Sequence, residues 1–303
     1  MRKHLTISIV TIGCALLLWG ARTTAQQSPD FSFSTIDFHG AIQTIAYGIN
    51  PGGDIVGAYR DSSGQHGFLL SGGNFNPIDA QIDGVTYAET SARGINPAGE
   101  IVGTYTVGSG PARIKGFLLS HGTFSTVLFG EHPGAIPQRI TPDGDIYGCY
   151  HDNDDGINIL ASTMHGFVRT RRSSIGLDVP ASMNNGATPN GHTIVGLWTD
   201  STGHRHGFLV QNGIFQSYDV PGSVLTAIWD INPGQEFVGT YFDSGANRHG
   251  FLQLPDGSAP VTIDYPGAAG TLPYGVNAGG VIVGSYSASG KTHGFFAVPR
   301  KSD

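Results

Sequence analysis

The sequence has few cysteines, few charged residues and no apolar run of the length that a membrane span needs. Only two cysteines occur in 303 residues. Cys14 lies in an apolar run from Leu5 to Trp19, which is too short for a typical membrane-spanning helix. Cys149 is the single cysteine of the remaining chain, so we expect a fold that does not depend on an intramolecular disulfide.

Charged residues make up 13% of the sequence, and the formal net charge is −7 at pH 7. Lys and Arg form no cluster: after residue 25, adjacent basic residues occur only at Arg171–Arg172 and at Arg300–Lys301. An acidic protein of this kind binds phosphate backbones and anionic lipid poorly, so we expect no nucleic acid and no membrane as a partner. The sequence also contains no G-x-S-x-G, H-E-x-x-H or phosphate-loop motif, and we predict no cofactor, no metal and no catalytic residue.

Residues 1–25 have the three-part pattern of a secretory signal peptide. Arg2 and Lys3 come first, the apolar run follows, and Thr23 and Ala25 are the small residues before a cleavage site. Removal of residues 1–25 changes the formal net charge from −7 to −10, since Arg2, Lys3 and Arg22 are lost. We therefore predict a secreted or periplasmic monomer with a single domain over residues 26–303, which is long enough for one large all-β core.

Glycine is abundant, with 46 residues, and much of it belongs to a sixfold repeat. The segment GINPGGDIVGAYRDSSGQHGF, residues 48–68, returns in recognisable form along the chain. A Gly-Phe dipeptide recurs with its phenylalanine at Phe68, Phe117, Phe167, Phe208, Phe251 and Phe295. A second marker is the glycine at Gly57, Gly103, Gly148, Gly196, Gly239 and Gly284, at steps of 43 to 48 residues. A period in this range, filled with short β-like runs and tight turns, is typical of propeller blades.

Each repeat reads as four short strands joined by turns, which predicts an antiparallel meander. Asn212-Gly213 and Asp256-Gly257 are dipeptides that favour type I′ hairpin turns between the last two strands. The chain ends at a third strand, residues 293–298, whereas a spare fourth-strand sequence stands at residues 31–38. We therefore predict an all-β, six-bladed β-propeller of four-stranded blades, closed by the N-terminal strand, which completes the last blade.

A histidine precedes Gly-Phe in five repeats, and hairpin symmetry places an aspartate opposite each one. In the second repeat Lys115 replaces the histidine and Leu128 replaces the aspartate, so the two positions change together. We interpret the pairs as structural cross-strand contacts, because one pair per blade cannot converge on a metal ion. The predicted pairs are His66–Asp79, His165–Asp178, His206–Asp219, His249–Asp264 and His293–Asp37.

The units GINPGGDIVG, GINPAGEIVG and GVNAGGVIVG, each followed by HGFL, KGFL or HGFF, resemble the bacterial extracellular HAF repeat, named for His-Ala-Phe. Here glycine stands in place of alanine in all six copies. The resemblance covers about residues 31–298, and it implies secretion by a bacterium and a β-rich repeat fold. The family carries no established activity to transfer, so the resemblance adds no site residues.

Function is expected where the repeats differ, at the first strand of each blade, which lines the axial channel of a propeller. Two adjacent positions vary in aromatic, amide and charged character: the glycine position of Gly-Ile-Asn and the residue directly before it. Such side chains suit a sugar or a peptide. The packing of neighbouring blades is the alternative role for these side chains. The candidate ligand-binding residues are Tyr47, Arg93, Gln138, Arg139, Asn185, Trp229, Asp230 and Tyr274.

We predict a binding module that recognises carbohydrate or a protein surface at this funnel. The alternatives are an extracellular glycosidase or lyase, which would assemble scattered groups such as Arg93, Arg139, Asp230 and Tyr274 in the same funnel, and a purely structural module. The acidic loop HDNDDG, residues 151–156, is interpreted as a solvated loop, because His151 stands where a calcium loop needs its first aspartate. Cys149 is expected to be a small buried core residue.

Overall fold

The structure is a computed structural model, and it describes residues 30–87, 89–108, 114–130, 132, 134–151, 164–177, 179 and 181–300. These residues form strands, turns and loops, and no helix occurs among them, which confirms the predicted all-β class. The described ranges therefore contain no helix with the length and apolar character to cross a membrane. The predicted signal peptide, Asp178 and residues 152–156 of the acidic loop lie outside the described residues.

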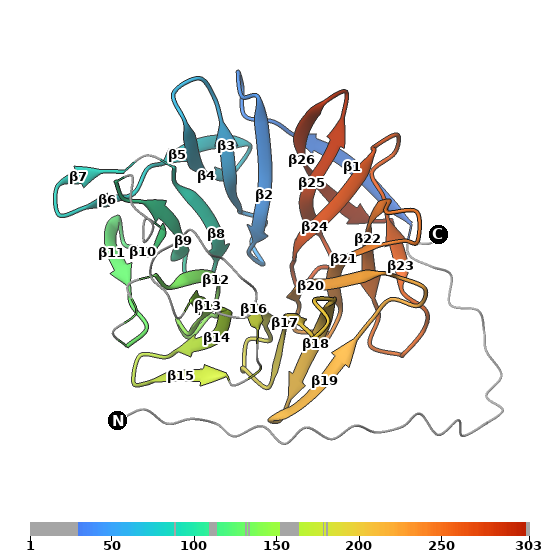
Figure 1. Cartoon of the computed structure of the whole chain (residues 1–303). Coiled ribbons are helices and arrows are strands. Elements are labelled where there is room, and N and C mark those ends of the chain that lie inside the picture. Colours follow the sequence, from blue (N-terminus) through green and yellow to red (C-terminus); the bar gives the residue numbers. More distant parts are fainter. Residues whose placement is uncertain are drawn as a thin grey trace.

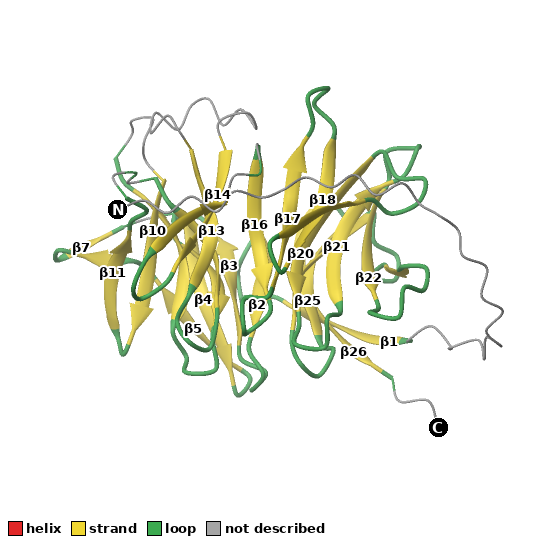
Figure 2. Ribbon diagram, turned by 90° about the horizontal axis from the view of Figure 1, so that it is seen from below, coloured by secondary structure: helices red, strands yellow, loops and turns green. Residues whose placement is uncertain are grey.

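The strands pair in antiparallel runs of four, each corresponding to one sequence repeat. Repeats 2, 3 and 4 form separate sheets, whereas repeats 1, 5 and 6 are linked into one twelve-stranded sheet. The links are single parallel pairs, Gln43 with Thr292 and Arg248 with Gly270. Figure 1 shows the repeats following one another around a common centre, with the first strand of each nearest to it. Figure 2 shows that the strands run between two faces, where the loops gather.

The strand bounds follow the repeats. Repeat 1 comprises β2 (Gln43–Ile49), β3 (Ile55–Arg60), β4 (Gln65–Ser71) and β5 (Asn74–Ile78), and repeat 2 comprises β8 (Ser91–Ile95), β9 (Ile101–Thr106), β10 (Ile114–Ser120) and β11 (Thr123–Val127). Repeat 3 comprises β12 (Ile136–Ile140), β13 (Ile146–His151), β14 (Met164–Arg169) and β15 (Ser174–Leu177), and repeat 4 comprises β16 (Ser182–Ala187), β17 (Thr193–Thr199), β18 (Arg205–Gln211) and β19 (Ile214–Tyr218). Repeat 5 comprises β20 (Leu225–Ile231), β21 (Phe237–Phe242), β22 (Arg248–Gln253) and β23 (Val261–Ile263), and repeat 6 comprises β24 (Gly270–Val276), β25 (Ile282–Ala288), β26 (Lys291–Pro299) and β1 (Phe31–Ile36). A small hairpin, β6 (Gln81–Ile82) and β7 (Val85–Thr86), stands between repeats 1 and 2.

The N-terminal strand β1 pairs antiparallel with the C-terminal strand β26. Thr35 lies opposite Phe295, and Ile36 lies opposite Gly294. The backbone pairing thus joins residues more than 250 positions apart, at the edge that the C-terminal repeat would otherwise leave unpaired. Figure 1 shows β1 alongside β26 at the outside of the molecule.

A buried Gly–Phe contact explains the two strongest markers of the repeat. In repeat 1, Gly57 of β3 lies directly opposite Phe68 of β4, and Phe68 has no solvent exposure. A Cβ atom on Gly57 would stand only 2.5 Å from the Phe68 ring and 2.1 Å from the Ile45 carbonyl oxygen. The phenylalanine of every Gly-Phe dipeptide is likewise fully buried. The ring therefore fills the space that the missing side chain leaves, which fixes glycine at this position.

The apolar core lies between neighbouring repeats rather than within them. Val56 of repeat 1 packs in one cluster with Ala92 and Phe117 of repeat 2. Val238 of repeat 5 likewise packs with Ile282 and Phe295 of repeat 6. Each repeat completes the core of the next, so a single repeat cannot bury its own apolar face.

Candidate functional site

A β-bulge occurs at the same position in the first strand of every repeat. The register of β2 against β3 shifts between Ala46 and Gly48, which leaves Tyr47 as the extra residue. A bulge bends the strand and redirects the side chain of the extra residue. The residues at the six bulges are Tyr47, Arg93, Gln138, Asn185, Trp229 and Tyr274. All six belong to the predicted site, so the bulge is the local structure that turns these side chains toward the axis.

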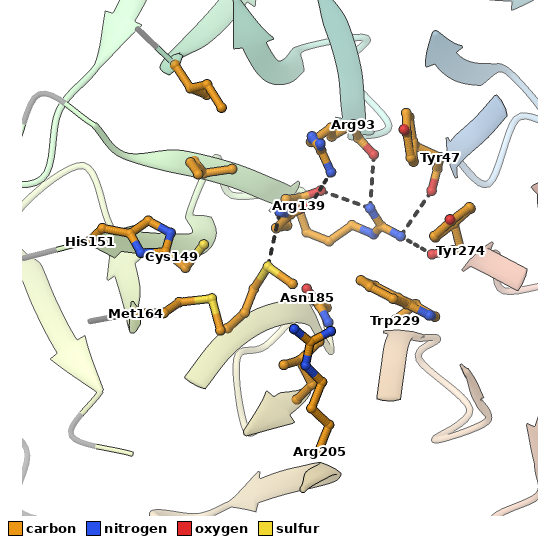
Figure 3. A pocket seen from close by; sticks show the side chains of 15 residues that line it. Tyr47, Arg93, Arg139, Cys149, His151, Met164, Asn185, Arg205, Trp229 and Tyr274 are labelled. Carbon is orange, nitrogen blue, oxygen red and sulfur yellow. Dashed lines mark hydrogen bonds between the residues drawn. The ribbon is translucent and has the colours of Figure 1, made fainter. Parts of the chain in front are cut away.

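The six bulge residues line one cavity of about 460 Å³, shown in Figure 3. Arg139 also lines it, so seven of the eight predicted site residues meet there. Its volume falls within the range of about 300–1,000 Å³ that is usual for small-molecule sites. The other lining residues are Ile114, Ile136, Cys149, His151, Met164, Met183, Leu197 and Arg205.

Three aromatic side chains form one wall of the cavity. The ring centroids of Tyr47 and Tyr274 are 5.2 Å apart, and those of Trp229 and Tyr274 are 5.3 Å apart at an interplanar angle of 67°. Trp229 therefore packs edge to face on Tyr274, the Tyr47 ring is tilted by 57° against Tyr274, and the three rings do not form a flat shelf. Trp229 Nε1 donates a hydrogen bond of 3.0 Å to Thr240 Oγ1, which fixes the indole plane. Burial raises the pKa of Tyr274, so its phenol stays protonated at neutral pH.

Arg93 brings a positive charge to the cavity. Its guanidinium carbon lies 5.0 Å from the centroid of the Tyr47 ring, and Nη1 donates a 3.1 Å hydrogen bond to Gln138 Oε1. Gln138 Nε2 in turn lies 3.4 Å from Met183 Sδ. Among the described residues, Arg93 is thus held by an aromatic face and a neutral amide and contacts no carboxylate.

Arg139 closes the axis beneath the cavity. Its Nη1 donates to the carbonyl oxygens of Arg93 (2.9 Å) and Gln138 (2.8 Å). Its Nη2 donates to the carbonyl oxygens of Tyr47 (3.0 Å) and Tyr274, as Figure 3 shows. These carbonyls come from four repeats, so the guanidinium ties the centre of the molecule together and has little capacity left for a ligand.

Asp230 is the one predicted site residue that does not line the large cavity. It is buried, and its Oδ1 lies 3.2 Å from Arg139 Nε while its Oδ2 accepts a 3.1 Å hydrogen bond from the Val276 amide. Burial raises the pKa of this carboxyl, and the positive charge of Arg139 opposes that shift. Asp230 borders a second cavity of about 100 Å³ lined by the Gly-Ile-Asn-Pro turns, and Arg139 touches both cavities.

Eight of the fifteen lining residues were not predicted from the sequence: six lie on second and third strands, and two, Ile136 and Met183, lie on first strands. Cys149 and Leu197 occupy a position that holds Ala, Thr or Ser in the other repeats. This difference between the repeats could have identified the two residues as candidates for the cavity lining. Arg205 stands directly before the histidine of His-Gly-Phe, another position at which the repeats differ. Cys149 is buried, as expected, and burial raises its pKa to about 12, so it is not a reactive thiol.

The described lining of the cavity contains no aspartate and no glutamate. Glycoside hydrolysis ordinarily needs two carboxyl groups about 5–10 Å apart. The side chains that meet here offer aromatic faces, amides and guanidinium groups, which bind but do not supply that acid–base pair. Elsewhere in the described part of the chain, no group of three or more His, Cys, Asp or Glu side chains is arranged to hold a metal ion.

Four of the five predicted His–Asp pairs are hydrogen-bonded in the structure. The His Nδ1 to Asp carboxylate distances are 2.8 Å for His66–Asp79, 2.9 Å for His206–Asp219, 2.7 Å for His249–Asp264 and 2.8 Å for His293–Asp37. The fifth pair involves Asp178, which lies outside the described residues. In each described pair the histidine lies on the third strand and the aspartate directly follows the fourth strand, away from the axis, and neither residue lines the cavity.

Comparison with known proteins gives a fold and no family. No protein-family model matches the chain, and no curated protein matches it in sequence. Among solved structures, the gluconolactonase XC5397 of Xanthomonas campestris is similar with a TM-score of 0.56 at 12% identity, over 92% of this chain and 93% of that one. A fucose-recognising lectin of Aleuria aurantia, described as a six-bladed β-propeller, has a TM-score of 0.51 at 12% identity, over 89% and 99%.

TolB of Acinetobacter baumannii is also similar, with a TM-score of 0.51 at 14% identity, over 84% of this chain and 63% of that one. Identities this low show shared architecture only. The chain has a β-propeller fold, built of blade-like antiparallel sheets around an axis.

Proposed function

We propose that this protein is an exported, six-bladed β-propeller that binds a carbohydrate in its axial cavity. The observation that carries the proposal is the convergence of the six bulge residues on one cavity of about 460 Å³. The cavity has three aromatic side chains on one wall and no carboxylate in its described lining. Sugar rings pack their apolar faces on aromatic side chains and use their hydroxyls for hydrogen bonds to amides and guanidinium groups.

Two contacts support the six-bladed, closed form of the propeller. The β1–β26 pairing gives repeat 6 its fourth strand. Between repeats 6 and 1, Asn277 Nδ2 donates a 3.3 Å hydrogen bond to the Asn50 carbonyl oxygen. The same contact links repeats 2 and 3 through Asn96 and Thr141, at 3.2 Å. The junction between the two ends of the chain is thus built like an internal one, as a closed ring of six requires.

Export is proposed from the pattern of residues 1–25, and the extracellular HAF-type repeat resemblance points the same way. A protein surface is the alternative ligand. A stable protein interface buries about 800 Å² on each partner and therefore needs a broad outer surface. The bulge residues instead converge on one concave cavity. We therefore favour a small saccharide unit over a protein partner.

Similar folds carry different activities, since one similar structure is a fucose-recognising lectin and another is a gluconolactonase. The fold therefore does not decide between binding and catalysis, and the side chains at the site must. Here the described lining lacks the acid pair of a glycosidase. This favours recognition over turnover.

The test is a glycan array combined with thermal-shift measurements on the wild-type protein and on Trp229→Ala. A bound sugar should raise the melting temperature of the wild type, because a ligand that binds the folded state stabilises it. Trp229→Ala should lose that shift. The matched control is Trp198→Ala, since Trp198 packs on His206 at 5.0 Å and does not line the cavity.

The proposal requires that the Trp198→Ala protein keeps the sugar-induced shift. Trp229→Phe retains an aromatic face and should keep part of the affinity, which guards against a general folding defect of the alanine variant. If no glycan binds, or if Trp229→Ala binds as tightly as the wild type, the axial site is not a sugar site. Release of reducing ends from a glycan would instead favour a glycosidase.

A further inference from the structure

The described lining of the axial cavity carries charge of the opposite sign to that of the whole protein. The chain carries a formal net charge of −7, yet the described lining holds Arg93, Arg139 and Arg205 and no carboxylate. The guanidinium group of Arg139 already donates hydrogen bonds to backbone carbonyl oxygens and forms an ion pair with Asp230. Arg93 and Arg205 therefore remain as guanidinium groups whose charge no carboxylate in the described residues neutralises within the cavity. A pocket of this kind attracts a negatively charged ligand.

The two arginines differ in how they are held. Arg93 is fixed over Tyr47, and its Nε has no hydrogen-bond partner in the described part of the chain although it is buried. Arg205 begins β18, and its side chain projects into the pocket from below Asn185 in Figure 3. A planar guanidinium fork is well suited to a carboxylate, since it can donate two parallel hydrogen bonds.

Asn185 supplies a second, independent sign of a missing polar partner. It is 1% exposed, and its Nδ2 donates a 2.8 Å hydrogen bond to the Ile228 carbonyl oxygen. Its Oδ1 accepts no hydrogen bond from any described residue, although the side chain lines the cavity. A buried acceptor without a donor is costly, and a ligand hydroxyl in the cavity would remove that cost.

The arginines, the unpaired amide oxygen of Asn185 and the aromatic wall together indicate which ligand would fit: one with a negative charge, a hydroxyl group and an apolar face. Inorganic anions such as sulfate would use the arginines and leave the aromatic wall empty, and neutral sugars would leave the positive charge unpaired. On these grounds we propose that the cavity selects an acidic sugar, a saccharide unit that carries a carboxylate. The carboxylate pairs with Arg205, Arg93 adds positive charge to the cavity, a ring hydroxyl donates to Asn185 Oδ1, and the apolar ring face packs on Trp229. This proposal rests on the carbohydrate-binding function above and specifies its ligand.

The experiment compares three probes of nearly equal size: galacturonate, its methyl ester and galactose. Their affinities are measured by calorimetry or by NMR titration at about 50 mM salt, where electrostatic contributions are weakly screened. We expect galacturonate to bind about 10-fold more tightly than the ester and galactose. Raising the salt to about 0.5 M should reduce this preference. Sulfate alone should bind at least about 10-fold more weakly than galacturonate.

The variant that tests the assignment is Arg205→Gln, and its matched control is Arg248→Gln. Both arginines precede the histidine of His-Gly-Phe and both are exposed, but the Arg248 guanidinium lies 5.5 Å from the Phe242 ring centroid and is not part of the cavity lining. Arg205→Gln should reduce the preference for the acid over the ester to about threefold or less. Arg248→Gln should leave it within about twofold of the wild-type value, since it removes the same charge outside the cavity.

Two failures are distinguishable. If the ester and galactose bind as tightly as the acid, or if Arg205→Gln keeps the full preference, the acidic-sugar inference is wrong while sugar binding stands. If none of the three probes binds and the glycan array is also negative, the proposed function itself is wrong. Sulfate that binds as tightly as galacturonate would identify a simple anion site and overturn the inference.

Discussion

Arg139 Nε lies 3.2 Å from Asp230 Oδ1, and this ion pair joins repeat 3 to repeat 5 across the axis. The two side chains are only 14% and 11% exposed. They stand at the position that holds glycine in the other four repeats, directly after the bulge. The two departures from the repeat pattern are therefore partners, and together they separate the large cavity from the small one.

We predict that this pair is strongly coupled. Arg139→Gln should lower the free energy of unfolding by about 3–5 kcal/mol, because it leaves the Asp230 carboxylate buried without its counter-charge. Asp230→Asn in the same background should recover about 1 kcal/mol or more, whereas Asp230→Asn alone should be destabilising. Urea unfolding of the four proteins in a double-mutant cycle measures the coupling. Additive effects of the two substitutions would show that the ion pair contributes nothing specific.

The His–Asp pairs should stabilise the fold without taking part in binding. His206→Ala removes a hydrogen bond to Asp219 and a stacking contact with Trp198. We expect a loss of about 1 kcal/mol, since the pair is partly exposed, which corresponds to about 2–4 °C in melting temperature. Thermal unfolding and ligand titration on one preparation provide the comparison. Weaker binding at unchanged stability would assign His206 to a ligand site instead.

The same pairs make stability depend on pH. Burial opposes protonation of His206, but the carboxylates of Asp219 and Asp200 raise its pKa above 6.5, and Asp264 and Asp243 raise the pKa of His249. A histidine whose pKa is higher in the folded state binds its proton more tightly there. Its contribution is complete below about pH 6.5 and is lost as the pH rises through the raised pKa.

The free energy of unfolding of the wild type should therefore fall between pH 6.5 and pH 8.5. Urea unfolding of wild type and of a His206→Gln/His249→Gln double variant at these two pH values measures the effect. The double variant should show a smaller decrease, since two of the titrating groups are gone. Equal decreases in the two proteins would exclude these histidines as the cause.

Two glycines in repeat 3 should respond in opposite ways to alanine. A Cβ atom on Gly148 would lie 2.2 Å from the Ile136 carbonyl oxygen, whereas one on Gly176 would have no neighbour closer than 3.9 Å. Gly148→Ala should cost about 3 kcal/mol through the backbone shift it forces. Gly176→Ala should be neutral or stabilise by up to about 1 kcal/mol. Chemical denaturation measures both, and equal stability of the two variants would contradict the Gly–Phe packing described above.

Cys149 should resist alkylation in the native protein. It is 1% exposed and its pKa is raised to about 12 by burial, so almost no thiolate forms at pH 8. Labelling with iodoacetamide at pH 8, read as mass on the peptide that contains Cys149, should be about 100-fold slower than in denaturant. Labelling of the native protein at the denatured rate would mean that the cavity wall opens readily.

Much of the fold could be predicted from the sequence because its determinants are local. The Gly57–Phe68 register, the four-strand repeat and the opposition of His206 and Asp219 all follow from hairpin symmetry and from side chains that alternate along a strand. The residues that line the axial cavity could also be anticipated from the sequence, because the bulge residues are the ones that vary between repeats.

Only the tertiary structure decided what those side chains do at the axis. Arg139 was predicted as a ligand-binding residue, but it donates to carbonyl oxygens from four repeats, and Asp230 lies beneath the cavity instead of lining it. Tyr47 and Tyr274, which touch at 5.2 Å, are separated by 227 positions in the sequence. Contacts of this kind depend on the positions that the bulges, the strand twist and the packing of the repeats together give to side chains near the axis. Local pattern fixes the strands, whereas the balance of charge and aromatic surface in the cavity exists only once the repeats meet.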